Sequence, residues 1–159
     1  MSKIAIYPGT FDPITHGHRD IVLRASQLFD RVIIAVSEHT HKNPAFDINE
    51  RIALATEVLT EFDRAEVKGF SNLLVDFARE QKANTIIRGL RAVSDLEYEF
   101  QLASMNRKLS PNIETIFLMP DEQYTYLSSS IVRQVASLKG DISDFVHPSV
   151  AKALTGKHC

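Results

Sequence analysis

The chain has one cysteine, no long hydrophobic run and no surplus of charge of either sign. Cys159 is the single cysteine among 159 residues, which excludes a disulfide within the chain and makes a reducing cytoplasm the expected location. The formal net charge of −2 argues against a protein that binds DNA or RNA, because such proteins usually present a basic footprint. Any anionic ligand must therefore be held by a local cluster of basic groups.

Hydrophobic segments are short throughout. The N-terminal stretch "MSKIAIYPG" is too brief for a signal peptide, and no window approaches the ~18 apolar residues of a membrane span. We therefore expect neither export by this route nor a membrane partner. No repeat, charge block or Pro/Gly/Ser-rich linker divides the chain, and a hydrophobic content of 44% is enough for a core. The sequence predicts one domain, residues 1–159.

Short β-rich apolar runs alternate with amphipathic stretches along the chain. The runs at 31–37 and 113–120 are almost continuously apolar, which is typical of parallel strands covered on both faces. The alternation predicts a doubly wound, Rossmann-like α/β domain with a five-stranded parallel sheet, followed by helices at 128–138 and 148–156. The predicted strands are 3–7, 31–37, 65–70, 84–89 and 113–120.

Several helix starts are marked by side chains that can cap them. Asp47 with Glu50, and Ser94 with Glu97, have the spacing of a capping box, in which each side chain accepts a hydrogen bond from a first-turn backbone N–H. Asn72 is the expected cap of the helix between the third and fourth strands.

Candidate functional residues gather where the predicted strands end. In an open α/β sheet ligands bind beyond the carboxyl ends of the strands, so side chains that follow different strands are expected to meet there. In chain order these residues are Gly9, Thr10, His39, His41, Lys42, Leu73, Leu74, Arg88 and Arg91.

The segment "GTFDPITHGH", residues 9–18, has the chemistry of a phosphate-binding turn. Gly9 allows a close backbone approach, Pro13 stiffens the turn, and Gly17 leads into a helix without a side chain in the way. His18 then lies in the first helical turn, where free N–H groups and the helix dipole favour an anion. The alternative is a tight turn that carries a surface histidine.

Two other segments offer anion-binding groups. In "RGLR" the guanidinium groups of Arg88 and Arg91 can converge on one dianion, or they can be two solvated surface arginines. In "SSSIVR" the hydroxyls of residues 128–130 and the first backbone N–H groups of a helix form a possible anion cradle. One of these serines is expected to serve as the N-cap at the same time.

A zinc site is a further possibility that the histidines raise. His16, His18, His39 and His41 follow the first two predicted strands and carry the nitrogen ligands that zinc accepts. We favour the phosphate interpretation, and we expect no metal held by the protein.

Four segments, in this order, resemble the nucleotidylyltransferase superfamily, in which a [H/T]-x-G-H element grips the phosphates of ATP or CTP. They are "GTFDPITHGH" (9–18), "HKNPAF" (41–46), "IIRGLRAVSDLEYEFQLASMNRKL" (86–109) and "YLSSSIVRQV" (126–135). Thr15 at the first motif position is typical of the phosphopantetheine adenylyltransferase family. The resemblance covers essentially the whole chain. It implies an enzyme that transfers the adenylyl group of ATP to 4′-phosphopantetheine, giving dephospho-coenzyme A and pyrophosphate, in coenzyme A biosynthesis.

The resemblance implies four catalytic residues. His18 and Thr10 would contact the α-phosphoryl oxygens, and Lys42 would bridge the attacking and transferred phosphates. Arg91 would hold the departing phosphates together with Ser129–Ser130.

The resemblance also implies two sets of binding residues. Tyr124 stands where some relatives have Trp and should still stack, and Glu99, which by itself is typical of a solvated helix carboxylate, would contact the nucleotide. The ATP-binding set is Thr10, Phe11, His18, Gly89, Leu90, Arg91, Glu99, Tyr124, Thr125, Tyr126, Leu127, Ser128, Ser129 and Ser130. The acceptor-binding set is Thr10, Lys42, Leu73, Leu74, Arg88 and Asn106.

Cofactor, assembly and regulation follow from the same resemblance. Mg²⁺ would arrive with ATP, the protein would form a homohexamer, and coenzyme A would inhibit by feedback. The sequence feature behind assembly is the apolar helical surface around "NLLVDFA" and "FQLASM".

Two other functions remain open. A pyridine-nucleotide or cytidylyl transferase would share the first motif, although Thr15, "RGLR" and "SSSIVR" argue against it. A non-catalytic adenine-nucleotide sensor on a similar sheet would have no need of His18 or Lys42 beside the α-phosphate.

Overall fold

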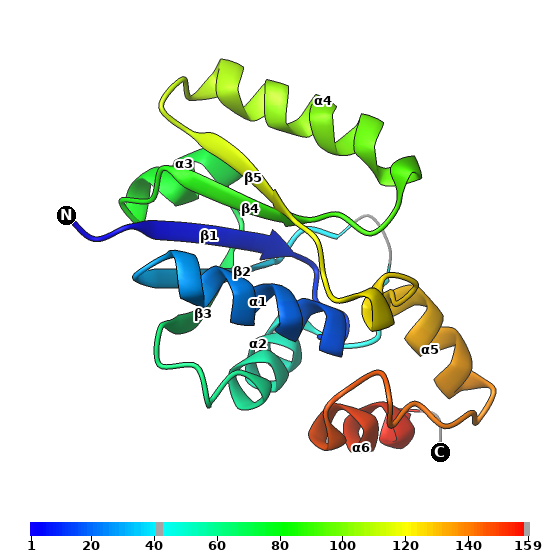
Figure 1. The fold of residues 1–159 in the computed structure, drawn as a ribbon. Helices are drawn as coiled ribbons and strands as arrows, with labels where there is room; N and C mark the ends of the chain where they lie inside the picture. The colour runs from blue at the N-terminus through cyan, green and yellow to red at the C-terminus, as the bar shows by residue number, and fades with distance from the viewer. Residues whose placement is uncertain (41–42, 158–159) are drawn as a thin grey trace.

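The fold is built on one parallel sheet of five strands. The structure is a computed structural model that describes residues 1–40 and 43–157, without the side chains of residues 93 and 94. The strand order is β3-β2-β1-β4-β5 (Figure 1), which confirms the predicted doubly wound, Rossmann-like α/β fold. The strands are β1 (Ile4–Gly9), β2 (Arg31–Ser37), β3 (Ala65–Phe70), β4 (Thr85–Gly89) and β5 (Glu114–Leu118).

Helices cover both faces of the sheet. α1 (His16–Leu28) and α2 (Ile48–Val58) pack on one face, α3 (Leu74–Glu80) packs on the other, and α4 (Val93–Leu109) lies along β5. Side chains of β1 and β2 alternate between the two cores, as the two-residue repeat of a strand requires. The central strands are therefore buried on both sides.

The prediction of two fully covered strands is right for β2 and wrong for β5. Five consecutive residues of β2 are buried. β5 is an edge strand with partly exposed residues on both faces, and Ile116 is 37% exposed. A continuous apolar run marked a strand in both cases, but it did not show what lies over the strand.

The predicted helix caps had mixed outcomes. Asp47 and Glu50 form the expected capping box at the start of α2. α4 begins one residue before Ser94, with Ala92 as its N-cap and no capping side chain, so the predicted capping box there is wrong. α3 begins after Leu73, and the Asn72 amide donates instead to the Glu80 carboxylate.

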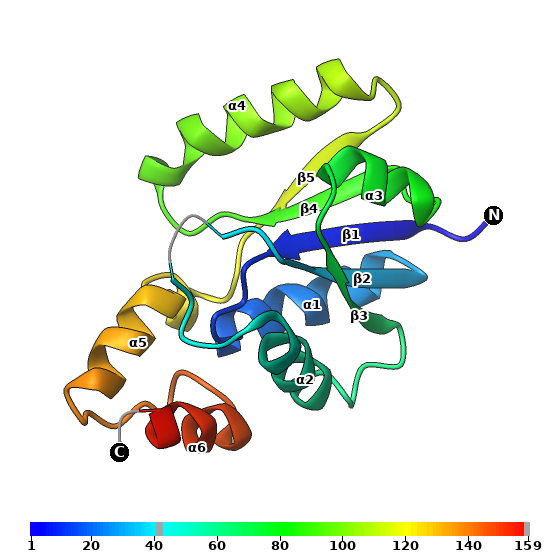
Figure 2. The ribbon, with the colours of Figure 1, turned by 180° about the vertical axis from the view of Figure 1, so that it is seen from behind.

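The chain ends in helices that return to the first face of the sheet. α5 (Ser129–Ser137) follows the short 3₁₀ helix η1 (Glu122–Tyr124), and α6 (Pro148–Lys157) packs against α2 and α5. Figures 1 and 2 show α5 beyond the carboxyl ends of the strands. Among the described residues, no helix combines the length and the apolar character needed to cross a bilayer.

Candidate active site

A pocket of about 450 Å³ opens at the carboxyl ends of β1 and β4. The sheet order reverses between these two strands, which is where open α/β sheets bind their ligands. The pocket wall combines the turn after β1, part of the segment after β2, the end of β4 and the start of α5. The predicted site residues that line it are Thr10, Phe11, His18, Arg88, Gly89, Arg91, Tyr124, Leu127, Ser128, Ser129 and Ser130.

Other predicted site residues lie elsewhere. Leu73 is half exposed at the start of α3, and Glu99 is buried behind Arg88. Lys42 and His41 fall outside the described residues. The predicted residues that do not line the pocket are Leu73, Leu74, Leu90, Glu99, Asn106, Thr125 and Tyr126, and their assigned roles remain predictions.

The turn after β1 is shaped around Phe11. Phe11 has a φ of 51°, in the left-handed region that non-glycine residues rarely adopt. Its ring packs edge-on against His18, with ring centroids 4.9 Å apart, and against Tyr7 at 5.4 Å. A Cβ at Gly9 would lie 3.0 Å from the Phe11 ring, so a side chain at position 9 would press the ring out of its present place.

His18 and Thr15 cap the start of α1 reciprocally. The backbone N–H of His18 donates to the Thr15 hydroxyl at 3.3 Å, and the backbone N–H of Thr15 donates to His18 Nδ1 at 3.0 Å. A nitrogen that accepts from a backbone N–H cannot carry the ring proton. In the neutral ring the proton is therefore on Nε2, and His18 lines the pocket as a hydrogen-bond donor.

The electrostatic surroundings keep His18 neutral. Burial, and then the positive charges of Arg91 and Arg88, lower the pKa of His18 from 6.5 to about 4. At neutral pH the imidazole is therefore uncharged. It can donate one hydrogen bond to an oxyanion without acting as a cation.

This pKa shift predicts a dependence of stability on pH. The pKa of His18 is 6.5 in the unfolded chain and about 4 in the folded chain, so the unfolded chain takes up the proton first as the pH falls. The contribution of His18 to the free energy of unfolding is therefore complete above pH 6.5 and is lost as the pH falls toward 4. Urea unfolding of His18→Gln, which keeps an acceptor for the Thr15 N–H, should show a shallower fall in the free energy of unfolding between pH 7 and pH 4.5. The exposed His39→Gln variant is the control, and equal slopes in all three proteins would contradict the shift.

Arg88 is held in the pocket wall by Glu99. The guanidinium Nε and Nη2 donate to the two Glu99 carboxylate oxygens, each at 2.8 Å, and Nη1 donates to the Pro8 carbonyl at 3.0 Å. Burial lowers the pKa of Arg88, but the hydrogen bond and charge of Glu99 outweigh it, so the net shift is upward. Arg88 thus presents a fixed cation to the pocket.

The start of α5 forms another part of the pocket wall. Ser128 is the N-cap, as predicted for one of the three serines, and its hydroxyl accepts from the Ile131 N–H. Ser129 donates to the Pro13 carbonyl at 2.7 Å, and Arg91 donates to the Leu127 carbonyl at 2.7 Å. The N-terminus of α5 therefore lies at the pocket beside a guanidinium group, an arrangement that suits phosphate oxygens.

Several pocket residues were missed at the sequence level. Asp12 and Arg133 both line the pocket, and Arg133 Nη1 donates to the Asp12 carbonyl at 2.6 Å. Arg133 follows Ser129 by four residues and therefore lies on the same face of α5, a signal that could have identified it. Gly9, Thr15 and Gly17 of the predicted phosphate-binding turn also line the pocket. The other missed lining residues are Tyr7, Pro8, Ile21, Thr40, Asn43, Pro44 and Pro120.

The acidic and histidine side chains do not form a metal cage within residues 1–40 and 43–157. No group of three or more His, Cys, Asp or Glu residues there could hold a metal ion. Asp12 is the sole carboxylate among the pocket-lining residues described, and its two oxygens accept from the N–H groups of Ala45 and Phe46.

Comparisons with known proteins agree with this architecture. A family model described as cytidylyltransferase-like matches residues 6–135. A phosphopantetheine adenylyltransferase from Nitrosomonas eutropha is 60% identical over 157 residues, which cover 99% of this chain and 95% of that protein.

Solved structures show the same fold at low identity. A candidate nicotinate-nucleotide adenylyltransferase from Vibrio parahaemolyticus superimposes with a TM-score of 0.75 at 18% identity, covering 98% of this chain and 99% of that one. A Plasmodium falciparum nicotinic acid mononucleotide adenylyltransferase complexed with APC gives a TM-score of 0.74 at 16% identity, covering 98% and 96%.

Proposed function

The chain belongs to the cytidylyltransferase-like family, and from this premise we propose that it transfers the adenylyl group of ATP to 4′-phosphopantetheine, forming dephospho-coenzyme A and pyrophosphate. We choose 4′-phosphopantetheine as the acceptor because the chain is 60% identical, over nearly its whole length, to a phosphopantetheine adenylyltransferase. The pyridine-nucleotide enzymes share only 16–18% identity with the chain, so the likeness to them supports the fold but gives no evidence about which acceptor is used.

The proposed reaction needs no protein nucleophile. A phosphomonoester loses its second proton near pH 6, so the acceptor phosphate is already an anion at neutral pH. One of its oxygens attacks the α-phosphorus of ATP, a P–O bond forms there, and the bond to the departing pyrophosphate breaks. The protein has to align the two phosphates and neutralise the charge that builds up between them.

The geometry of the pocket supports a role for each wall. His18 Nε2–H would donate to an α-phosphoryl oxygen, and Thr10 lies at the neighbouring turn. Arg91 and the N-terminus of α5 would hold the β- and γ-phosphates, and Arg88 would hold the acceptor. The bridging role predicted for Lys42 remains a prediction.

ATP would enter as its magnesium complex. Asp12 is the sole carboxylate among the pocket-lining residues described, so phosphate oxygens and water would supply most of the ligands of a magnesium ion in this pocket. Magnesium bound in this way would offset charge on the triphosphate.

A test of three acceptors decides the function. We expect pyrophosphate release from ATP with 4′-phosphopantetheine, and release at least about 10³-fold slower with nicotinate mononucleotide or glycerol phosphate, whose shapes leave polar groups of the site unpaired. Preferred use of nicotinate mononucleotide would indicate a pyridine-nucleotide enzyme. ATP binding without pyrophosphate release from any acceptor would indicate a nucleotide sensor.

Assembly into a homo-oligomer, expected to be a hexamer, is part of the proposal. α4 and β5 expose Tyr98, Phe100, Met105, Leu109 and Ile116, each between 37% and 60%, and apolar side chains exposed in this number on two neighbouring elements favour association. The segment "NLLVDFA" does not add to it as expected, because its apolar side chains other than Leu73 pack largely against the sheet.

Sedimentation of the purified protein tests assembly. We expect a species of roughly six times the chain mass of 17.9 kDa at micromolar concentration, because burying these apolar side chains stabilises association. A stable monomer would contradict the proposal. Feedback inhibition by coenzyme A and a cytoplasmic location remain expectations of the family resemblance.

A further inference from the structure

Arg51 is a buried cation in α2 whose hydrogen bonds run to backbone carbonyls. It is 2% exposed. Its Nη1 donates to the carbonyls of Thr10 and Ser37, each at 2.8 Å, and its Nε donates to the Phe46 carbonyl at 3.1 Å. Burying a guanidinium costs free energy, and these three bonds offset that cost. They join the turn after β1, the end of β2 and the residue before the N-cap of α2.

Asp12 makes the complementary connection. Its side chain accepts from the Ala45 N–H at 2.8 Å and from the Phe46 N–H at 2.9 Å, and the residue is 4% exposed. Its carbonyl accepts from Arg133, which brings in α5. One residue of the phosphate turn therefore fixes two other segments of the pocket wall.

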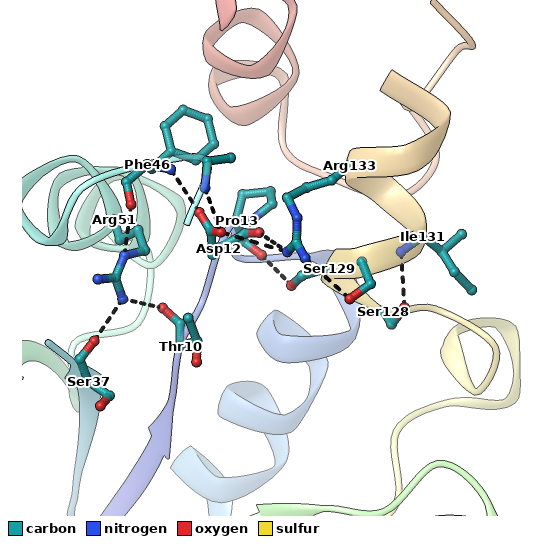
Figure 3. A network of polar contacts seen from close by, with 12 residues as sticks. Thr10, Asp12, Pro13, Ser37, Phe46, Arg51, Ser128, Ser129, Ile131 and Arg133 are labelled. Atoms are coloured by element: carbon teal, nitrogen blue, oxygen red, sulfur yellow. Dashed lines mark hydrogen bonds and ion pairs between the residues drawn. The ribbon is translucent and has the colours of Figure 1, made fainter. Parts of the chain in front are cut away.

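The two side chains connect the same pair of segments, the turn after β1 and residues 45–46. Figure 3 shows Arg51 reaching Thr10, and Asp12 reaching toward Phe46 and Arg133. Residues 43–44, which precede the N–H groups bound by Asp12, line the pocket, as does Thr10. The separation of these two walls is therefore set by hydrogen bonds of side chains that are themselves almost fully buried.

We propose that Arg51 and Asp12 are positioning residues for adenylyl transfer, which hold the Thr10 turn and the 43–46 segment at a fixed separation. This proposal rests on the proposed function. A displacement of about 1 Å in a reacting geometry can cost 10²-fold in rate, so small shifts of these walls should appear in kcat. A role in stability alone would leave kcat of the folded protein unchanged.

Arg51→Lys separates the two possibilities. Lysine keeps the charge but offers a single nitrogen in place of the planar fork that spans three carbonyls. We expect kcat to fall by about 10- to 50-fold, with smaller changes in KM for either substrate, at a temperature where the variant is fully folded by circular dichroism. Arg64→Lys is the matched control, because Arg64 also donates to backbone carbonyls, those of Ser26 and Phe29, at the opposite end of the sheet.

Asp12→Asn supplies an independent second variant. Asparagine keeps the size of the side chain, but its NH₂ group opposes one of the two backbone N–H groups, so we expect a loss of kcat of similar size. If Arg51→Lys does not fold, the kcat of Asp12→Asn decides between a positioning role and a role in stability alone. If the wild type is active and a folded Arg51→Lys or Asp12→Asn protein has a kcat within twofold of it, the positioning role is overturned and the proposed function still stands. A wild type inactive with 4′-phosphopantetheine would overturn the proposed function, and this inference with it.

Discussion

Replacing His18 by alanine should lower kcat by about 10²–10³-fold and leave KM for ATP and 4′-phosphopantetheine close to wild type. The neutral ring donates through Nε2, because Nδ1 accepts from the Thr15 N–H and the pKa of the ring lies near 4. Such a donor contributes most when negative charge builds on the α-phosphoryl oxygens in the transition state. Steady-state kinetics with each substrate varied in turn measure kcat and the two KM values separately.

His16→Ala is the control for this variant. His16 lies on the same helix and near Tyr124, with ring centroids 6.1 Å apart, but it is not a pocket-lining residue. The kcat of the His16→Ala variant should therefore stay close to the wild-type value. His18→Ala also removes half of a capping box, so its fold is checked by circular dichroism and its unfolding midpoint is measured. A near-normal kcat in a folded His18→Ala protein would show that His18 does not serve the transition state.

Replacing Arg88 by alanine should raise KM for 4′-phosphopantetheine by about 10- to 100-fold, the loss expected for hydrogen bonds to a charged group, and raise KM for ATP less. The guanidinium lies in the pocket wall and is held in place by Glu99 and the Pro8 carbonyl. Some loss of kcat should follow, because a loosely held acceptor is misaligned for attack. Kinetics with each substrate varied in turn separate the two KM values.

Arg107→Ala is the matched control for Arg88→Ala. Arg107 also pairs with a glutamate, Glu114, but it is exposed and away from the pocket, so both KM values should be unchanged. Arg88→Ala leaves the Glu99 carboxylate buried without its partner, so a lower unfolding midpoint is expected as well. A rise in KM for ATP alone would place Arg88 at the nucleotide rather than at the acceptor.

Much of the fold was predictable because its signals are local. β2 spans the predicted residues 31–37 because a strand buried on both faces must be apolar along its length. The start of α4 was misplaced because Ser94 and Glu97 have the spacing of a capping box, yet the helix begins without a capping side chain at Ala92. A capping-box spacing permits a helix start at Ser94 but does not require one.

The site was predictable where it depends on topology. Parallel strands bring their carboxyl ends together, so Thr10, His18, Arg88 and Arg91 meet as expected. The tautomer of His18 was not foreseen, because the known capping-box pattern has Glu or Gln at the place where this chain has histidine. Arg51 was missed because it binds backbone atoms of remote segments, such as the Thr10 carbonyl 41 residues away, and leaves no sequence pattern.

The central claim is that this pocket moves an adenylyl group directly from ATP to the phosphate of 4′-phosphopantetheine. Single-turnover incubation with ATP radiolabelled at the α-phosphate tests it most directly. We predict that the label passes from ATP to dephospho-coenzyme A, with one pyrophosphate released per label transferred and no label attached covalently to the protein at any time. Label attached covalently to the protein, or released as AMP while phosphopantetheine is unchanged, would contradict the account.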